Sequence, residues 1–347
     1  MKPTGIHVLV FKRNRRIIYH TECICEVYMQ TIRFAILGAG GIAAKFKDAI
    51  DRTEGAEVVA VSSKSLERAA AFAEKHNISR WYGSYAEMLS CPDIDAVYIA
   101  TTHNFHMENI MECINAGKHI VCEKPMVLTE ADARKVFAHA GKKGVFLMEA
   151  MWSRFLPHLQ QAKQWITEGR IGKIESVRAV IGFRGNEKFE TRLYNPDLAG
   201  GGLYDIGVYP IEIVSWLVGE PVEDCLSMWR KHPVTGVDEN VSMILRYRSC
   251  DAVIQCLITC TVKEHIILDG TKGSIEIPRS HLGDTCILYD ENCREAERFT
   301  CTYPNGFIYE AAEAVQCIRE GRQFSETIPP EDTIACAHIF DKVLGTK

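Results

Sequence analysis

The stretch that decides the fold is Thr31–Phe46, TIRFAILGAGGIAAKF, in which a short aliphatic run ends at a cluster of glycines. Thr31–Leu37 has the β-branched and aliphatic character of a buried strand, and a helical pattern runs on from Ala43 through Ile50. The intervening GxGxxA sequence begins at Gly38. A strand, a glycine turn and a helix in this order predict a dinucleotide-binding βα unit.

The residue type at each position of this turn has a physical reason. Gly38 permits the tight turn, a side chain at Gly40 would block pyrophosphate from the backbone, and small Ala43 lets the helix pack on the strand. The N–H groups at the helix start, near Gly41 and Ile42, supply positive potential for phosphates. We expect all five residues to bind the cofactor. The alternative is a tight turn that binds no ligand.

The end of the second strand, Ala56–Val61, should meet the adenine ribose of a bound dinucleotide. A carboxylate there would favour the free 2′-hydroxyl of NAD. This chain instead has Ser63 and Lys64, followed by Arg68 on a helix. Hydroxyls and cations suit a 2′-phosphate, so the sequence predicts NADP rather than NAD. Lys64 could alternatively be a solvated residue at a helix start.

Apolar strands alternate with helices up to about residue 150, which predicts a doubly wound parallel sheet and an α/β Rossmann domain over residues 31–150. The further strands expected are Ala96–Ala100, His119–Cys122 and Val145–Glu149, with helices at Met107–Ala116 and Thr129–Gly141. Ligands bind beyond the carboxyl ends of such strands. This rule selects Thr101–His106, Glu123–Pro125 and Met151–Phe155, and from them Thr101, His103, Glu123 and Lys124 as cofactor contacts.

Residues 151–347 have a different pattern, with strands that follow one another through short turns. The strands expected are Lys173–Phe183, Val241–Tyr247, Ala252–Thr259, His265–Asp269 and Ser274–Ile277. The turn Asp269–Gly273 is a hairpin signal. Strands without intervening helices predict a separate α+β domain with an open, mainly antiparallel or mixed sheet.

A glycine-rich segment, Ala199–Gly202, leads into a helix that carries Asp205 and Tyr209. Residues four apart share a helix face, although Pro210 must fall in the first turn or kink the helix. A nearby ammonium such as Lys124 is expected to lower the pKa of Tyr209 and to make it a usable proton relay. The alternative is that Tyr209 is a half-buried aromatic of the helix.

Composition excludes several classes of protein. The 347 residues carry 40 Lys+Arg and 45 Asp+Glu, a net charge of −5 that argues against nucleic acid or a membrane surface as partner. The 14 cysteines lack CxxC spacing and do not cluster with histidines, so we expect reduced thiols in the cytoplasm and no metal site. Residues 1–30 have a local charge of +3 and are interpreted as an N-terminal extension outside the fold, with Met29 as the natural start; the alternative is a short strand or arm that packs on a partner.

GAGGIA, EKP and GGGLYDIGVYPI, in this order and at these separations, resemble the glucose–fructose oxidoreductase / inositol dehydrogenase (Gfo/Idh/MocA) family. The resemblance covers Thr31 to the C-terminus. The phrase EAMWSRF at Glu149–Phe155 looks like the branch that contains dimeric dihydrodiol dehydrogenase and NADP-dependent D-xylose dehydrogenase. Thr102 departs from the family, whose members usually have proline there.

The resemblance implies an NADP-dependent oxidoreductase that transfers hydride between the nicotinamide and a carbinol or carbonyl of a small sugar or diol. It makes Tyr209 the acid/base, Lys124 its charged helper and Asp205 an orienting residue. Trp152 and Arg154 would line the substrate cleft beside Tyr209, and the polar segment Asn186–Asn195 is expected to help shape it. It also implies that residues 151–347 bind substrate and form a homodimer, with the C-terminal helix packed back on the first domain.

Two other functions remain open on the sequence. One is a regulator of the same fold that senses NAD(P) without turnover. The other is an NAD-linked dehydrogenase of an inositol or a nucleotide sugar, which histidine at position 209 or an acid near Ser63 would favour.

Overall fold

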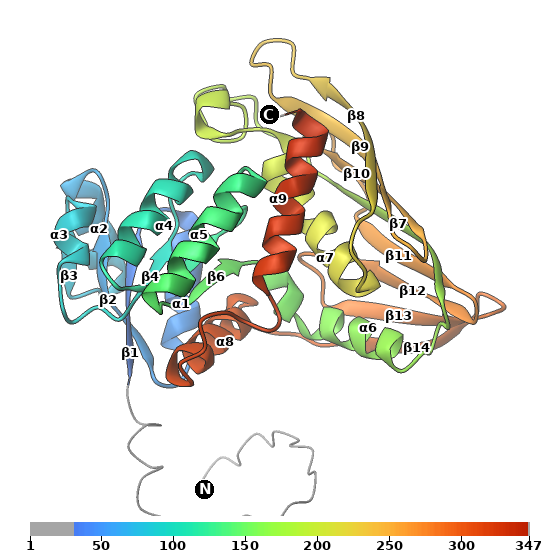
Figure 1. Ribbon diagram of the computed structural model, residues 1–347, viewed down its shortest axis with the longest axis horizontal. Helices are drawn as coiled ribbons and strands as arrows, with labels where there is room; N and C mark the ends of the chain where they lie inside the picture. Colours follow the sequence, from blue (N-terminus) through green and yellow to red (C-terminus); the bar gives the residue numbers. More distant parts are fainter. Residues whose placement is uncertain (1–30, 346–347) are drawn as a thin grey trace, which may run out of the picture. The chain divides into compact units, whose positions relative to one another are not determined.

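The computed structural model describes residues 31–345, which form one compact unit (Figure 1). The expected N-terminal extension lies outside the described residues. The chain first builds a parallel sheet wrapped by helices, then a second, larger sheet, and finally two helices that return to the first half.

The first sheet has six parallel strands in the order β3-β2-β1-β4-β5-β6, so the predicted doubly wound Rossmann fold is confirmed. The strands are β1 (Ile32–Leu37), β2 (Ala56–Ser62), β3 (Arg80–Tyr82), β4 (Ala96–Ile99), β5 (His119–Glu123) and β6 (Leu147–Ala150). The helices between them are α1 (Gly41–Asp51), α2 (Leu66–His76), α3 (Tyr85–Leu89), α4 (His106–Asn115) and α5 (Glu130–Lys143). The strand order reverses between β1 and β4, and the crevice at such a switch point is where ligands bind.

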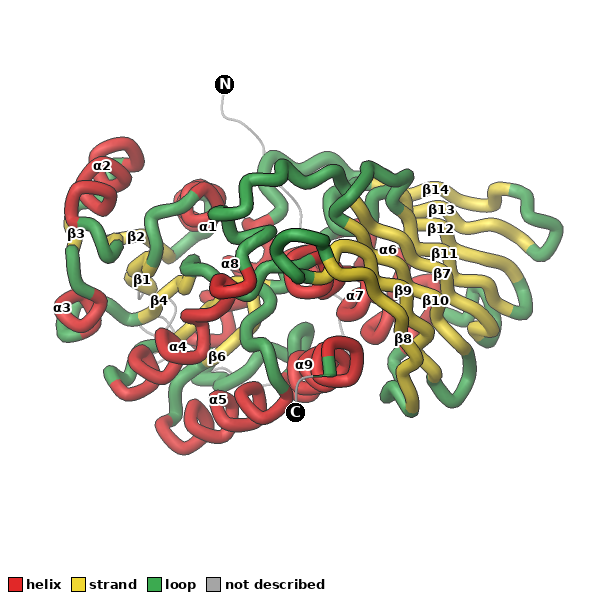
Figure 2. The backbone as a smooth tube through the Cα atoms, turned by 90° about the horizontal axis from the view of Figure 1, so that it is seen from above, coloured by secondary structure: helices red, strands yellow, loops and turns green. Residues whose placement is uncertain are grey.

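The second sheet has eight strands in the order β14-β13-β12-β11-β7-β10-β9-β8, which can be followed in Figure 2. Only β7 and β10 run parallel, so the predicted mixed, mainly antiparallel sheet is confirmed. Its strands are β7 (Ile174–Gly182), β8 (Asp224–Lys231), β9 (Asp238–Arg246), β10 (Asp251–Leu257), β11 (His265–Gly270), β12 (Gly273–Pro278), β13 (Thr285–Asp290) and β14 (Glu295–Thr300). Helices α6 (Pro157–Thr167) and α7 (Val208–Val218) pack on one face of it.

The last two helices, α8 (Phe307–Arg319) and α9 (Pro330–Leu344), lie against the Rossmann half (Figure 1). Helix α8 packs on α1, and α9 packs on both α5 and α7. The side chain of Thr333 donates to Glu149 Oε2 at 2.7 Å, and the Glu130 backbone N–H donates to Asp341 Oδ2 at 2.9 Å. These contacts connect the C-terminal segment to residues far away in the sequence.

The glycine-rich segment enters α7 through a widened turn. Residues Leu203–Gly207 form a single π-helical turn, in which the Val208 N–H bonds to Leu203 O five residues earlier. Gly201 has a φ of +126°, and a Cβ there would lie 2.0 Å from Asp238 Oδ1, so only glycine fits. Pro210 falls in the first turn of α7, where it does not break the helix.

Candidate active site

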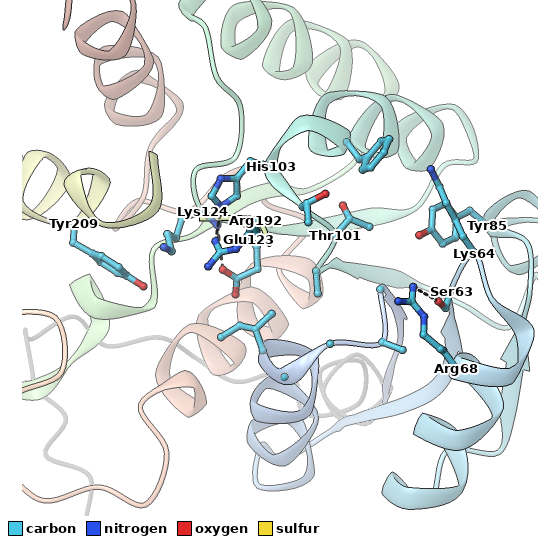
Figure 3. A pocket seen from close by; sticks show the side chains of 18 residues that line it. Ser63, Lys64, Arg68, Tyr85, Thr101, His103, Glu123, Lys124, Arg192 and Tyr209 are labelled. Atoms are coloured by element: carbon cyan, nitrogen blue, oxygen red, sulfur yellow. Dashed lines mark hydrogen bonds between the residues drawn. The ribbon is translucent and has the colours of Figure 1, made fainter. Parts of the chain in front are cut away.

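A cavity of about 620 Å³ lies beyond the carboxyl ends of the parallel strands. Figure 3 shows Lys124 and Tyr209 toward one end of it and Ser63, Lys64 and Arg68 toward the other. Among its lining residues there are four cations, Lys64, Arg68, Lys124 and Arg192, against one carboxylate, Glu123. Such an excess of positive charge suits a ligand that carries phosphates.

The glycine turn forms the floor of this cavity. Gly38 has a φ of +109°, and a Cβ there would lie 2.7 Å from Ala100 O on the neighbouring strand end. A Cβ on Gly40 or Gly41 would meet no protein atom within 4 Å. These two glycines are therefore not required by packing, and the open space above them is what a pyrophosphate on the helix N-terminus would fill.

The far end of the cavity carries the hydroxyl and the two cations expected from the sequence. Arg68 Nη2 donates to Ser63 Oγ at 3.1 Å, and the Lys64 ammonium lies 3.9 Å from the ring centroid of Phe105. Phe105 thus holds Lys64 by a cation–π contact that leaves its ammonium free to meet an anion. Among residues 31–345, no carboxylate lines this end.

Lys124 enters the cavity from the end of β5 and is held by the π-helical turn. Its ammonium donates to the backbone carbonyl of Asp205 and lies 3.7 Å from Asp205 Oδ1. The same carboxylate oxygen pairs with Arg192 Nη1 at 2.6 Å. Burial lowers the pKa of Lys124, and the negative charge of Asp205 opposes that shift. Asp205 does not line the cavity and acts on it by positioning Lys124.

Tyr209 reaches the same end of the cavity from α7 in the other half of the molecule. The Lys124 ammonium lies 4.5 Å from its ring centroid, and Trp152 Nε1–H donates to its hydroxyl at 3.2 Å. Because an indole N–H can only donate, the Tyr209 oxygen accepts this bond and its own proton is left for another acceptor.

The expectation that Lys124 lowers the pKa of Tyr209 is wrong for this structure. Burial, reinforced by the charge of Glu123, raises that pKa, and the hydrogen bond from Trp152 only partly offsets the effect. Lys124 lies beside the ring instead of at the hydroxyl oxygen. The phenol therefore keeps its proton at neutral pH.

His103 lies between the two halves. Its Nε2 faces Arg192 Nη1 at 2.9 Å and its Nδ1 faces Ala199 O at 3.3 Å. Because the guanidinium can only donate and the carbonyl can only accept, the neutral ring carries its proton on Nδ1. Burial and the nearby charge of Arg192 lower the pKa of His103 well below its usual value, in keeping with this neutral form.

The structure brings most of the residues selected from the sequence to this one cavity. Those that line it are Gly38, Gly40, Gly41, Ile42, Ser63, Lys64, Arg68, Thr101, His103, Glu123, Lys124 and Tyr209. Ala43 lies buried beneath the turn, and Trp152 contacts the cavity only through the Tyr209 hydroxyl.

Arg154, expected at the substrate cleft, lies elsewhere. Its guanidinium is almost fully buried and pairs with Glu212 at 3.1 Å and Asp332 at 2.7 Å, beside a second cavity between α6, α7 and α9. A buried cation requires such partners, and these carboxylates come from α7 and α9. They turn Arg154 away from the first cavity, so its expected role is corrected.

Arg192 also lines the cavity; the sequence selected only its segment, Asn186–Asn195, and not this residue itself. It lies in the segment between β7 and α7, where no periodic pattern or motif marks it, and it reaches Asp205 and His103 only in the folded chain. Ala39, Tyr85 and Ala100 line the cavity without having been selected, whereas Thr102 and Phe105 belong to the selected segment Thr101–His106.

Comparisons with known proteins agree in both halves of the chain. Residues 32–151 match the family described as "Oxidoreductase family, NAD-binding Rossmann fold", and residues 159–276 match the "GFO/IDH/MocA C-terminal domain". A trans-1,2-dihydrobenzene-1,2-diol dehydrogenase of Xenopus tropicalis is 34% identical over 90% of this chain and 97% of its own length. The enzyme of that name from Homo sapiens is 31% identical over 90% of this chain and 96% of its own length.

Solved structures share the fold at lower identity. A 3-ketoreductase from Actinomadura kijaniata, in complex with NADP and TDP-benzene, has a TM-score of 0.83 at 24% identity, covering 91% of this chain and 98% of its own. An aldose-aldose oxidoreductase from Caulobacter crescentus, complexed with glycerol, has a TM-score of 0.84 at 24% identity, covering 91% and 97%.

Two further observations concern residues 31–345. None of their helices is long and apolar enough to cross a membrane. Within that range, no three His, Cys, Asp or Glu side chains gather in a way that could hold a metal ion.

Proposed function

The chain belongs to the Gfo/Idh/MocA oxidoreductase family, and on that premise we propose that it is an NADP-dependent dehydrogenase or reductase acting on a CH–OH group of a small sugar or diol. The observation that carries the proposal is the meeting of Lys124 and Tyr209, from opposite halves, at the end of a cavity that begins at the glycine turn. The diol and sugar enzymes among its relatives support this substrate class.

The cofactor site supports NADP over NAD. Gly38, Gly40 and Gly41 would hold the pyrophosphate, and Ser63, Lys64 and Arg68 would surround a 2′-phosphate. The adenine ribose of NAD is usually bound by a carboxylate at the end of β2, and this chain has Ser63 there. When bound, the nicotinamide supplies the hydride acceptor or donor.

The protein's own side chains transfer one proton and stabilise the charge that develops on the substrate oxygen. Tyr209, protonated and with its hydroxyl oxygen held by Trp152, donates its proton to the oxygen of a substrate carbonyl during reduction. Lys124, positioned by Asp205, stabilises the negative charge that develops on that oxygen. In oxidation Tyr209 must first lose its own proton to solvent, and its phenolate then takes the proton of the substrate hydroxyl.

Removing the phenol hydroxyl tests the assignment. We expect Tyr209→Phe to lower kcat by about 10²–10⁴-fold, the range of general acid–base catalysis, because the ring packing remains but the proton donor is lost. NADPH affinity, measured by fluorescence titration, should stay close to that of the wild type. Turnover that survives the substitution unchanged would refute the role of Tyr209.

We assign residues 31–150 to cofactor binding and residues 151–347 to substrate binding and dimerisation. The outer face of β8–β10 supports a homodimer, because Leu226, Ile244 and Val253 are adjacent in register and are 62%, 39% and 49% exposed. The twelve cysteines within residues 31–345 are all free thiols, which supports a reducing compartment and hence the cytoplasm.

A further inference from the structure

A histidine–carboxylate pair outside the predicted site packs directly on Tyr209. His281 follows β12, and Glu264 precedes β11 on the adjacent strand. A single carboxylate oxygen, Glu264 Oε1, accepts three hydrogen bonds: from His281 Nδ1 at 2.8 Å, from the His281 N–H at 3.0 Å and from Ser280 Oγ at 2.9 Å. The backbone and the ring of His281 are thus fixed by the same group.

The segment that carries His281 is also held from two other elements. On one side, the fully buried His158 of α6 donates through Nε2 to Ser280 O at 3.2 Å. On the other, the Tyr303 hydroxyl donates to Gly283 O. Because hydrogen bonds hold the chain on both sides of His281, the fold fixes the position of this residue.

His281 lies next to the catalytic phenol. Its ring centroid is 4.6 Å from that of Tyr209, with 36° between the ring planes. The same phenol contacts Lys124 and Trp152. His281 is not itself one of the residues that line the cavity, but its ring packs on Tyr209, so a substrate held at the Tyr209 hydroxyl would lie close to the imidazole.

The free end of the imidazole can be identified from the partners of the other end. Although burial opposes ionisation, the hydrogen bond and charge of His281 lower the pKa of Glu264, so this carboxylate accepts the Nδ1 proton. His281 Nε2 has no hydrogen-bond partner among residues 31–345 and is not one of their buried unpartnered atoms. The side chain keeps 15% of its surface exposed. An oriented nitrogen with solvent access is available to a ligand.

We propose that His281, oriented by Glu264, hydrogen-bonds a second oxygen of the substrate beside the one that reacts at Tyr209, and so selects vicinal diols and polyols over simple alcohols. The inference rests on the proposed function and narrows its substrate class. Glu264 is a positioning residue, whereas His281 contacts the substrate.

The test compares a vicinal cyclohexanediol with cyclohexanol, using the full chain and NADP. The wild type should prefer the diol in kcat/KM, and His281→Phe should reduce this preference about tenfold, the effect of one lost hydrogen bond. His281→Gln should keep more of the preference, because its amide can still hydrogen-bond. If His281 served only to pack against Tyr209, His281→Phe should instead keep more of the diol preference than His281→Gln, because phenylalanine preserves the ring contact with Tyr209 better than glutamine does.

A matched control is His139→Phe on α5, remote from the cavity, which should leave the preference unchanged. A binding measurement tests the role of His281 independently of catalysis by Tyr209. In the Tyr209→Phe background, adding His281→Phe should weaken diol binding to the NADPH complex about tenfold, measured by fluorescence quenching. A wild type without preference for the diol, or equal diol binding with and without His281, would overturn the proposal even if Tyr209 proves catalytic.

Discussion

The environment of the Tyr209 side chain determines its protonation state. Burial raises its pKa, so the phenol keeps its proton at neutral pH, which is the form that the proposed carbonyl reduction requires. For oxidation the phenol must first lose this proton before it can accept one from the substrate, which becomes easier as the pH rises. The ammonium of Lys124 alone does not create a phenolate, since its position beside the ring favours the anion less than burial disfavours it.

The proposed preference for NADP over NAD can be tested at Lys64. We expect Lys64→Ala to weaken NADP binding by about 10–100-fold, the worth of a charge-assisted hydrogen bond, and to leave NAD binding nearly unchanged. Fluorescence titration with NADPH and NADH measures both affinities.

Lys75→Ala, at the exposed C-terminal end of α2, the helix that follows Lys64, is the matched control for charge. Its NADPH affinity should equal that of the wild type. If Lys64→Ala weakened both cofactors to the same degree, Lys64 would not contact the phosphate that distinguishes them.

Residues within a local motif could be found from the sequence, because neighbours in the chain are enough to determine their conformation and role. The glycine turn, Ser63 with Lys64, and Lys124 after a strand all belong to this class. The sequence could not single out Arg192 within Asn186–Asn195, and it did not indicate His281 at all, because each contacts a partner that is distant in the chain. Arg154 was misplaced for the same reason, because its partners Glu212 and Asp332 lie far from it in sequence.

At the scale of elements, the π-helical turn before α7 connects the second sheet to Lys124. Asp238, at the start of β9, accepts from the Leu203 N–H at 2.6 Å and fills the space beside Gly201. The π-helical turn held in this way presents the Asp205 carbonyl to Lys124. A strand residue thereby fixes the helix start that holds the ammonium of Lys124.

Asp238 should make stability depend on pH. Burial raises its pKa from 3.8 to about 7, so the folded state binds this proton more tightly than the unfolded state does. The free energy of unfolding should therefore fall, as the pH rises through that window, by about 1.4 kcal/mol per pH unit from this group. Asp238→Asn should lack the slope, so its stability relative to the wild type improves with pH in urea titrations.

An exposed carboxyl on the neighbouring strand gives the control for this measurement. Asp224→Asn on β8 should follow the wild-type pH dependence. Parallel curves for the wild type and Asp238→Asn would show that the Asp238 carboxyl does not carry the expected linkage.

The elements that the sequence predicted are those with a continuous apolar run or strict alternation, such as β1 and β10. It missed β3, β8, β13 and β14. Strand β14 (EAERFT) is almost wholly exposed, so it has no buried face to produce a pattern. The π-helical turn was also missed, because its cause is the tertiary contact with Asp238.

For the whole molecule, the bare face of the eight-stranded sheet is the feature with the largest consequence for assembly. Within residues 31–345, α6 and α7 pack on one face, whereas Leu226, Ile244 and Val253 lie on the other. A row of apolar side chains across β8–β10 is typical of a surface that another protein covers.

A charge in the middle of this row should separate the subunits. We expect Ile244→Lys to weaken the dimer on the order of 30-fold or more, as for a central interface residue, and to give monomers in sedimentation experiments. Trp81→Lys, at a residue 49% exposed on β3, should leave the assembly state as it is. A wild type that is monomeric at high concentration would contradict the proposed homodimer.

The return of the C-terminal segment bears on how the protein can be dissected. Phe324 packs edge-on against Phe137 of α5, the Gln323 carbonyl accepts from the Leu147 N–H at 3.0 Å, and Asn305 donates to Lys45 O at 2.9 Å. A fragment cut after residue 150 would lose these partners and expose the apolar surface that α8 and α9 now cover. The nucleotide-binding half is therefore not a detachable module: any truncation, fusion or swap of this half must carry the chain's last forty or so residues with it.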